Sequence, residues 1–347
     1  MNIADVEIGL HCRPAIIAEM SGNHNQSLDR ALKIVDAAVE AGVHLLKLQT
    51  YTADTITLDV QKEGFLIDDE NSLWAGRTLY SLYEEAHTPW EWQEAIITRA
   101  QSRGVPCFSS VFDDTSVEFL EGLNIAAYKF ASQEIVHLPL IELVAKLGKP
   151  MILSTGMATI SEIGEAVEVA RTSGCVDLAL LKCTSSYPAS AANSNVVTIP
   201  EMRKIFNCEV GLSDHTLGLG AAIAAVSHGA TLIEKHLTLS RSDGGVDSDF
   251  SMEPNEMQLL VEESESARLS LGKVYFGPSE AEQASMSGRR SIYSCKPIKK
   301  GEFFCEENVR VVRPNLGMEP KFFKHIIGRK AKIDLDHGTP ISWDVID

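Results

Sequence analysis

The sequence is short of basic residues, with 31 lysines and arginines against 48 aspartates and glutamates and a formal net charge of −17. Nucleic acids and anionic membranes are recognised by clustered Lys and Arg, so this balance argues against both as partners. Long apolar runs are also missing, since none approaches the roughly 20 residues that span a bilayer. We therefore expect a protein of small-molecule chemistry, in which an anionic substrate needs a locally basic pocket.

The sequence also lacks the signatures of secretion. The first residues, "MNIADVEIGLHCRP", show no basic stretch followed by an apolar one, so they do not resemble a signal peptide. The seven cysteines include no CxxC pair and no framework spacing. Such thiols are typical of a reducing compartment, so we expect a cytoplasmic protein in which Cys183 is a small core residue.

What the sequence does have is a repeating alternation of strand and helix patterns. Apolar, β-branched runs predict strands at 15–22, 44–51, 106–113, 126–133, 150–157, 178–185, 209–216 and 231–239. Between most of them lie amphipathic stretches such as 27–42 and 159–174, which begin with Ser or Thr and end on Gly. About eight such units predict an α/β protein with a (β/α)8 TIM barrel. A doubly wound open sheet is the alternative, although no GxGxxG follows the first strand.

Each predicted strand turns polar at its C-terminal end. In a barrel these ends surround one mouth, where the active site of this fold lies. A single polar strand end is easily explained by contact with solvent, but a complete ring of them indicates a site. The ring consists of Glu19, Lys47, Gln49, Ser109, Ser110, Lys129, Ser132, Ser154, Thr155, Thr184, Ser185, Ser213, Asp214, His215, Glu234 and His236.

The composition divides the chain into three parts. Residues 1–275 carry the barrel pattern, and the polar stretch 276–291, with its Gly and Pro, predicts a linker. Residues 292–347 hold short strands and turns and predict a second, small domain. Within the barrel, the insertion 52–87 between the second and third strands predicts a lid or a loop that shapes the substrate site.

Two lysines lie inside mostly apolar runs, Lys47 in "LLKLQ" and Lys129 in "YKFAS". A buried lysine is costly unless it is paired or functional, so we expect a role for both. Two roles remain open. One lysine with a lowered pKa forms a Schiff base with a substrate, or both lysines bind a phosphate or carboxylate together with nearby serines. Their position on two different strands favours the anion pocket.

Two histidines, His215 and His236, end consecutive strands that are neighbours in a barrel. Two imidazoles there can share a divalent cation, or one bonds to a strand-end carbonyl while the other is exposed. The letters Ser213-Asp214-His215 do not make a hydrolytic triad, because neighbouring strand residues point to opposite faces. We expect Asp214 to be structural.

Two carboxylates stand near this mouth. Glu19, in the apolar run "IAEMSG", is a candidate acid or base, or else the pairing partner of a lysine. Asp247 lies in the loop "GGVDSDF", within reach of the mouth. It binds a hydroxyl or a metal-bound water, or else it forms a turn.

A set of motifs gives the sequence a family resemblance: "IAEMSGNHNQSL", "LKLQTYTADTITL", "YKFASQE", "STGMA", "LLKCTSSYP", "VGLSDHTLG", "IEKHLTLSR" and "GGVDSDFS". Together they resemble the bacterial nonulosonic (sialic) acid synthases, which condense phosphoenolpyruvate with an amino sugar. The resemblance covers nearly the whole chain, and the C-terminal part resembles the family's antifreeze-like (SAF) domain.

Within the family, "LWAGRTLYSLYEEAHTPWEW" (73–92), "NHNQSL" and "GRKAKIDLDHGTPISWDVI" are more similar to pseudaminic acid synthases than to N-acetylneuraminate synthases. The implied sugar is 2,4-diacetamido-2,4,6-trideoxy-L-altrose. N-acetylmannosamine and the legionaminic acid precursor are the alternatives. The implied reaction is metal-dependent and releases phosphate by C–O cleavage.

The resemblance also implies roles for individual residues. It places a divalent metal on His215 and His236, with Mn2+ expected and Mg2+ or Co2+ as alternatives, and it assigns Glu19 and Asp247 to catalysis. Phosphoenolpyruvate falls on Lys47, Ser110, Lys129, Ser132, Ser154, Ser185 and Ser213. The sugar falls on Gln49, Glu134, Tyr187 and Arg313. The resemblance implies a swapped homodimer in which the antifreeze-like domain lends Arg313 to the sugar site of the other subunit.

Three positions depart from the family pattern. Val111 follows Ser110 where Pro is usual, Ser185 stands where sialic acid synthases carry Asn, and Asn315 replaces a usual Gly after "RP". We expect Val111 to alter its loop slightly and Asn315 to affect the geometry that presents Arg313, whereas Ser185 is consistent with a different subfamily. The rival functions are a Schiff-base aldolase and a non-catalytic carbohydrate-binding protein that kept the fold.

Overall fold

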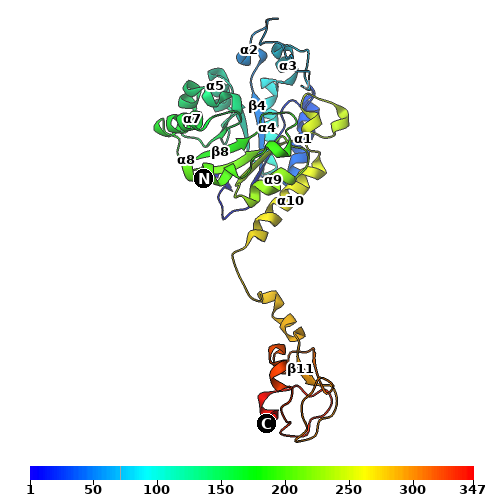
Figure 1. Cartoon of the computed structure of the whole chain (residues 1–347). Coiled ribbons are helices and arrows are strands. Elements are labelled where there is room, and N and C mark those ends of the chain that lie inside the picture. The colour runs from blue at the N-terminus through cyan, green and yellow to red at the C-terminus, as the bar shows by residue number, and fades with distance from the viewer. Residues whose placement is uncertain (71) are drawn as a thin grey trace. The chain divides into compact units, whose positions relative to one another are not determined.

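The computed structural model describes residues 1–70 and 72–347, which form two compact units, Met1–Gly272 and Lys273–Asp347 (Figure 1). The first unit begins with the short strands β1 (Asn2–Ile3) and β2 (Val6–Glu7), which pair with each other. In the described part of the chain, no helix is long and apolar enough to cross a membrane.

The first unit is a closed barrel of parallel strands in chain order, with the last strand paired to the first. This closure confirms the predicted TIM barrel and rules out the open sheet. The register runs from Leu232 opposite Ala15 to His236 opposite Glu19. The barrel strands are β3 (Ala15–Glu19), β4 (Leu45–Thr50), β5 (Cys107–Val111), β6 (Tyr128–Phe130), β7 (Met151–Ser154), β8 (Leu178–Cys183), β9 (Glu209–Ser213) and β10 (Leu232–His236).

Helices follow the strands, and their ends match the sequence signals. At α1, the Ser27 side chain accepts a hydrogen bond from the Arg30 N–H, and at α7 Thr159 and Glu162 form a capping box. Both helices are followed by a glycine with positive φ, Gly42 and Gly174. The outer helices are α1 (Leu28–Glu40), α4 (Trp90–Ser102), α5 (Asp114–Gly122), α6 (Leu138–Ala145), α7 (Ile160–Thr172), α8 (Thr198–Phe206), α9 (Gly220–Ser227) and α10 (Pro254–Leu271).

Alternation along the strands gives the barrel two apolar layers. One face of each strand packs against the helices, as Ile16 and Leu46 do. The other face points into the barrel, where Ile17, Leu45 and Phe108 belong to an inner core. Successive residues of a strand face opposite sides of the sheet. The residues two and four positions after an inner-core residue therefore also point into the barrel, closer to the C-terminal end of the strand.

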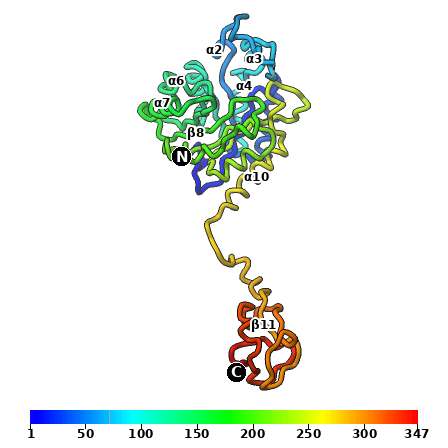
Figure 2. The backbone as a smooth tube through the Cα atoms, in the orientation of Figure 1, coloured from blue at the N-terminus to red at the C-terminus, as the bar shows by residue number. Residues whose placement is uncertain are grey.

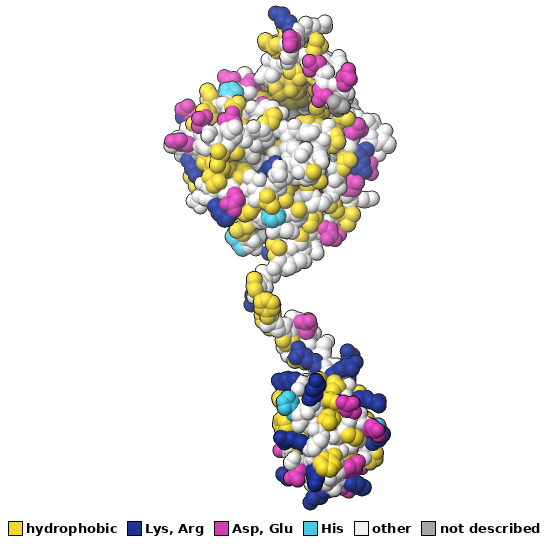
Figure 3. Space-filling view, in the orientation of Figure 1, with side chains coloured by type: hydrophobic (Ala, Val, Ile, Leu, Met, Phe, Trp, Pro, Cys, Tyr) yellow, Lys and Arg dark blue, Asp and Glu magenta, His cyan; other side chains and the backbone are white. Residues whose placement is uncertain are grey.

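The insertion after β4 contains two helices, α2 (Ala53–Ile56) and α3 (Leu79–Ala86), which pack against each other. A bridge between Leu66 and Thr78 joins its two arms. Figure 2 shows the insertion at one end of the barrel unit, and in Figure 3 apolar side chains gather around this end.

The second unit has its own core, which includes Ile292, Phe304 and Ile341. Its antiparallel strands are β11 (Ser291–Ser294) and β12 (Val309–Val312), and its helix is α11 (Phe323–Ile326). Short 3-10 turns occupy Glu280–Glu282 and Ala284–Gly288, within the stretch expected to be a linker.

Candidate functional site

A cavity of about 510 Å³ lies where the strands end. Its floor consists of the inward positions that follow the inner core, so on β4 the apolar Leu45 gives way to Lys47 and Gln49. The other seven barrel strands, or the segments that directly follow them, also bring residues to this place. Polar cavity-lining residues carried by the strands or the segments directly after them are Ser21, Lys47, Gln49, Lys129, Ser132, Gln133, Glu134, Ser154, Ser213, His215, Glu234 and His236.

On the floor of the cavity, Lys47 forms ion pairs with two glutamates. Its Nζ lies 2.5 Å from Glu19 Oε2 and 2.9 Å from Glu234 Oε1. All three side chains are at most 5% exposed. Burial lowers the pKa of Lys47 to about 8, against the opposing charge of Glu234. Burial disfavours the charge of Glu234, but Lys129 and Lys47 overcome it and hold the pKa of this carboxyl below its usual range.

Lys129 is held by a separate set of contacts. Its Nζ donates to Ser154 Oγ at 2.7 Å and to the Phe130 carbonyl at 2.9 Å, and it lies 4.0 Å from Glu234. Ser213 Oγ donates to Glu234 at 3.2 Å, and Ser132 Oγ accepts from the Gly156 N–H at 3.0 Å. Two ammonium groups and three serine hydroxyls therefore lie at one cavity wall, which is the chemistry of an anion pocket.

The position of Glu19 does not match its assignment to catalysis, which requires contact with the substrate. It is fully buried, and it is not one of the residues that line the cavity. Its Oε1 accepts from the Ser21 N–H at 2.8 Å, and its Oε2 pairs with Lys47. Of the two roles that the sequence left open, these contacts correspond to the partner of a lysine.

The two histidines lie side by side, with ring centroids 5.5 Å apart. His215 Nδ1 is 3.0 Å from the Thr184 carbonyl, which leaves its other ring nitrogen for the cavity. His236 Nδ1 is buried without a hydrogen-bond partner and lies 3.5 Å from Asp247 Oδ2. Burial and the neighbouring His215 lower the pKa of His236 well below its usual value, so this imidazole is neutral. The neutral His236, the other ring nitrogen of His215 and the Asp247 carboxylate fit a divalent cation.

Two acids line the cavity directly. Asp247 accepts a hydrogen bond from Ser21 Oγ, and burial raises its pKa. Glu134 follows β6, and burial raises its pKa to about 7 against the opposing charge of Lys129. Its Oε2 is buried without a partner. A carboxyl that titrates near neutrality in a cavity is suited to proton transfer.

Aromatic rings close one side of the cavity. The centroid of the Tyr187 ring lies 4.5 Å from the ring centroid of His215, 5.6 Å from that of Trp74 and 5.3 Å from that of Phe250. Trp74 belongs to the insertion, and its Nε1 donates to the Val246 carbonyl at 2.8 Å. This bond joins the insertion to the loop that carries Asp247.

Besides Glu19, three of the expected site residues do not line the cavity. Ser110 is 1% exposed and its Oγ has no partner, but it does not line the cavity. Ser185 is also absent from the lining, and its Oγ lies 3.9 Å from the Cys183 sulfur. Arg313 follows β12 in the C-terminal unit, where it is exposed.

Several residues that line the cavity received no catalytic or binding role from the sequence, among them Glu234, Ser21, Trp74 and Cys183. From the sequence, Glu234 was recognised only as a polar strand end. In "LIEKH" it lies two positions before His236 and therefore on the same face of the strand, which was the signal that could have found it. Ser21 and Trp74 had no comparable signal. Cys183, expected in the core, is 5% exposed but also lines the cavity, 4.0 Å from His215 Nδ1.

Asp214 points away from the site, as expected for a structural residue. Its Oδ2 accepts from Lys235 Nζ at 2.8 Å, and its Oδ1 accepts from the Thr216 N–H at 2.9 Å. Lys235 Nζ also donates to the Thr216 carbonyl at 2.7 Å. This buried pair holds the backbone on both sides of His215. The Ser213 hydroxyl bonds to Glu234, so the consecutive letters make no triad.

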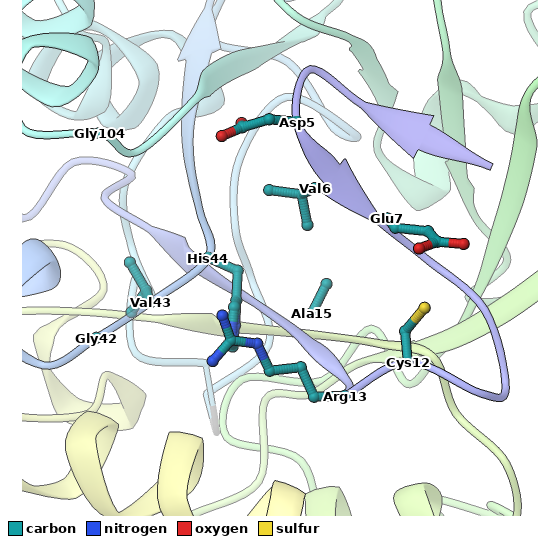
Figure 4. A pocket seen from close by; sticks show the side chains of 10 residues that line it. All are labelled: Asp5, Val6, Glu7, Cys12, Arg13, Ala15, Gly42, Val43, His44 and Gly104. Carbon is teal, nitrogen blue, oxygen red and sulfur yellow. The ribbon is translucent and has the colours of Figure 1, made fainter.

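A second cavity, of about 390 Å³, lies at the opposite end of the barrel, where β3 and β4 begin (Figure 4). Glu7, Cys12 and His44 are among its walls. Glu7, His11 and Cys12 each bring one potential metal ligand within 4.8 Å of the others, but the first two are exposed and already pair with each other. None of the site residues expected from the sequence lines this cavity.

Comparison with known families agrees with the two units. The NeuB family matches residues 34–275, and the SAF domain matches residues 289–346. A pseudaminic acid synthase of Campylobacter jejuni is 43% identical over 329 residues, 94% of each chain. The pseudaminic acid synthase of Helicobacter pylori is 41% identical, over 96% of this chain and 98% of its own.

Another relative and two solved structures are less similar in sequence. The N,N'-diacetyllegionaminic acid synthase of C. jejuni is 34% identical, over 91% of this chain and 95% of its own. The crystal structure of the spore coat polysaccharide biosynthesis protein SpsE of Bacillus subtilis covers all of this chain and 99% of its own, at 33% identity and a TM-score of 0.68. The N-acetylneuraminic acid synthetase of Leptospira borgpetersenii, solved with citrate, is 30% identical with a TM-score of 0.72, over 82% and 94% of the two chains.

Proposed function

The chain belongs to the NeuB family, and from this premise we propose that it is a pseudaminic acid synthase. It condenses phosphoenolpyruvate with 2,4-diacetamido-2,4,6-trideoxy-L-altrose, forms a C–C bond and releases phosphate. The proposal rests on one observation above all: the anion pocket of Lys47 and Lys129 and the histidine pair belong to the same cavity. The relatives named as pseudaminic acid synthases support this sugar over that of the legionaminic acid synthase.

Phosphoenolpyruvate binds at the wall that carries Lys47, Lys129, Ser132, Ser154 and Ser213. The lysines offset its charge inside a body that is otherwise acidic, and the serine hydroxyls donate to its oxygens. Ser110 and Ser185 contribute to the same wall only if it shifts when the substrate binds, because neither lines the cavity.

His215 and His236 would hold a divalent metal, which we propose to be Mn2+, together with Asp247, whose Oδ2 lies 3.5 Å from His236 Nδ1. When bound, the metal would polarise the aldehyde oxygen of the open-chain sugar as a Lewis acid. The neutral state of His236 keeps its ring nitrogen available as a ligand.

The remaining chemistry concerns protons. C3 of phosphoenolpyruvate attacks the aldehyde carbon, water adds to C2, and the tetrahedral intermediate expels phosphate by C–O cleavage. Glu134 lines the cavity with a pKa of about 7, and we propose that it accepts the proton of the attacking water. Glu19 instead pairs with Lys47 and holds its Nζ in place. Gln49, Tyr187 and Asp247 contact the sugar.

We propose a homodimer in which Arg313 of the partner subunit completes the sugar site. The charge distribution supports such docking: residues 273–347 carry 13 basic and 10 acidic side chains, whereas residues 1–272 carry 18 basic and 38 acidic ones. Mixed dimers of an Arg313→Ala chain and a His236→Ala chain should regain activity, because one of their sites contains both groups. No recovery after verified subunit exchange would contradict the swapped arrangement.

The function is tested by measuring phosphate release from phosphoenolpyruvate with a panel of amino sugars. The trideoxy sugar should give the highest kcat/KM, and release with only N-acetylmannosamine or the legionaminic acid precursor would reassign the acceptor. The enzyme is expected to act in the cytoplasm, where phosphoenolpyruvate is available.

The Schiff-base aldolase is the second candidate, because a lysine with a pKa of about 8 has more of the unprotonated, nucleophilic amine near neutral pH than a free lysine has. Two carboxylates within 2.9 Å of Lys47 Nζ favour its charged form instead. Borohydride treatment in the presence of pyruvate separates the two functions, since a covalent adduct on Lys47 or Lys129 would establish the aldolase.

A further inference from the structure

The cavity has a polar floor and an apolar roof. Whereas the floor comes from strand ends, the roof comes from the insertion, whose described lining residues are Ile56, Ile67, Ser72, Trp74, Leu79, Leu82, Tyr83 and Ala86. The insertion has ten charged residues between positions 52 and 87, and within its described part none of them lines the cavity. Figure 3 shows apolar side chains gathered around this end of the barrel unit.

The roof offers few hydrogen bonds to a ligand. The indole N–H of Trp74 already donates to the Val246 carbonyl at 2.8 Å. Ile56, Ile67, Leu79 and Leu82 have no polar side-chain atoms. Among the described residues of the roof, Ser72 and Tyr83 bring hydroxyls, and Ser72 Oγ already accepts from the backbone N–H of Trp74 at 3.2 Å. A sugar hydroxyl that faces the Ile and Leu side chains loses water without gaining a partner, whereas a methyl group gains by leaving water.

The floor determines which end of the substrate meets the roof. The aldehyde carbon must lie beside the lysines and the histidines, because the C–C bond forms there. In an open-chain sugar, C6 is the carbon farthest from the aldehyde. The end of the molecule that carries C6 therefore extends from the floor toward the insertion.

We propose that the apolar roof recognises the C6 methyl group and makes the enzyme selective for 6-deoxy sugars over the same sugars with a hydroxymethyl group. This inference rests on the proposed function and assigns recognition of the C6 end of the substrate to the insertion. Leu79 is the central residue: it lines the cavity from α3, one helical turn from the buried Leu82.

The test uses two acceptors that differ by one atom: 2,4-diacetamido-2,4,6-trideoxy-L-altrose and the same sugar with a hydroxyl on C6. The wild-type kcat/KM should favour the deoxy sugar by about 100-fold, the size of discrimination that an apolar pocket achieves. Leu79→Asn, which keeps the side-chain size and adds hydrogen-bonding groups, should reduce this ratio at least about tenfold. The KM for phosphoenolpyruvate should not change.

Leu58→Asn is the matched control, because Leu58 belongs to the same insertion, is 62% exposed and does not line the cavity. It should keep the wild-type ratio. Ile67→Thr is a second roof variant, for the case that Leu79→Asn disturbs the local fold. The backbone of residue 67 donates to the Arg77 carbonyl and accepts from the Gly76 N–H, and the substitution keeps both bonds. It should also reduce the ratio.

The outcomes separate this inference from the function on which it rests. Equal wild-type rates with the two sugars would overturn the inference and leave the synthase intact. An unchanged ratio in both roof variants would do the same. Absence of phosphate release with every acetamido sugar would overturn the proposed function, and the inference with it.

Discussion

The capture of phosphoenolpyruvate should depend on pH through Lys47. Burial lowers the pKa of this lysine to about 8, whereas a free lysine has a pKa of about 10.4. Only the protonated amine attracts the substrate's anionic groups, so kcat/KM for phosphoenolpyruvate should fall as the pH rises above about 8. One unit above the pKa, about one-tenth of the amines keep their proton, which predicts a tenfold fall by about pH 9.

Two variants test whether Lys47 is the group responsible. Lys47→Arg keeps its charge up to about pH 12, so the fall above about pH 8 should disappear even if the overall rate is lower. Glu234→Gln removes a charge that raises the pKa of Lys47, so its break should move to a lower pH.

The assay is the initial rate of phosphate release with the sugar saturating and phosphoenolpyruvate far below its KM. A fall that persists unchanged in Lys47→Arg would refute the reasoning, because another group would then titrate. A wild-type profile that stays flat until free lysine titrates would refute it as well, since Lys47 would then be no weaker a base than a lysine in water.

Glu134→Gln should lower kcat by about 10²–10⁴-fold with little change in the KM for phosphoenolpyruvate, because it removes the proposed proton acceptor and no contact to the phosphate; a loss confined to KM would contradict this role. His236→Ala should abolish metal-dependent phosphate release and weaken Mn2+ binding in equilibrium dialysis, while circular dichroism shows a folded barrel; full activity after EDTA treatment of the wild type would argue against the metal. Lys235→Met leaves the Asp214 carboxylate buried and unpaired, so urea unfolding should show a loss of about 3–5 kcal/mol. Lys33→Met, which removes an exposed pair with side chains 64% and 79% exposed, should cost less than about 1 kcal/mol; equal losses in the two variants would contradict the importance of the buried pair.

The barrel was predictable because its signals are local. Each predicted strand contains an observed one, since apolar β-branched runs and N-cap serines act over a few residues. The alternation of side chains along a strand is equally local. It places Lys47 and Gln49 on the inner face of the barrel and Asp214 on the outer face. The same rule would have identified Glu234, had it been applied to "LIEKH" as it was to the histidine.

What the sequence did not determine depends on contacts between distant residues. Glu19 can be interpreted equally as an acid and as a pairing partner until the register of β3 and β4 brings Lys47 within 2.5 Å of it. Ser110 has the right residue type and pairs in register with Gln49 and Lys129, which line the cavity, yet Ser110 itself does not line it.

By itself, then, the sequence determined the order of the elements, the end of the barrel at which the polar groups gather and the residue types that do chemistry there. The tertiary structure alone decided which of those groups meet. Lys47 and Glu234 are 187 positions apart, and only closure of the barrel brings their charges within 2.9 Å. It also decided that the insertion covers the site with apolar side chains, because no local pattern specifies which surface a long loop packs against.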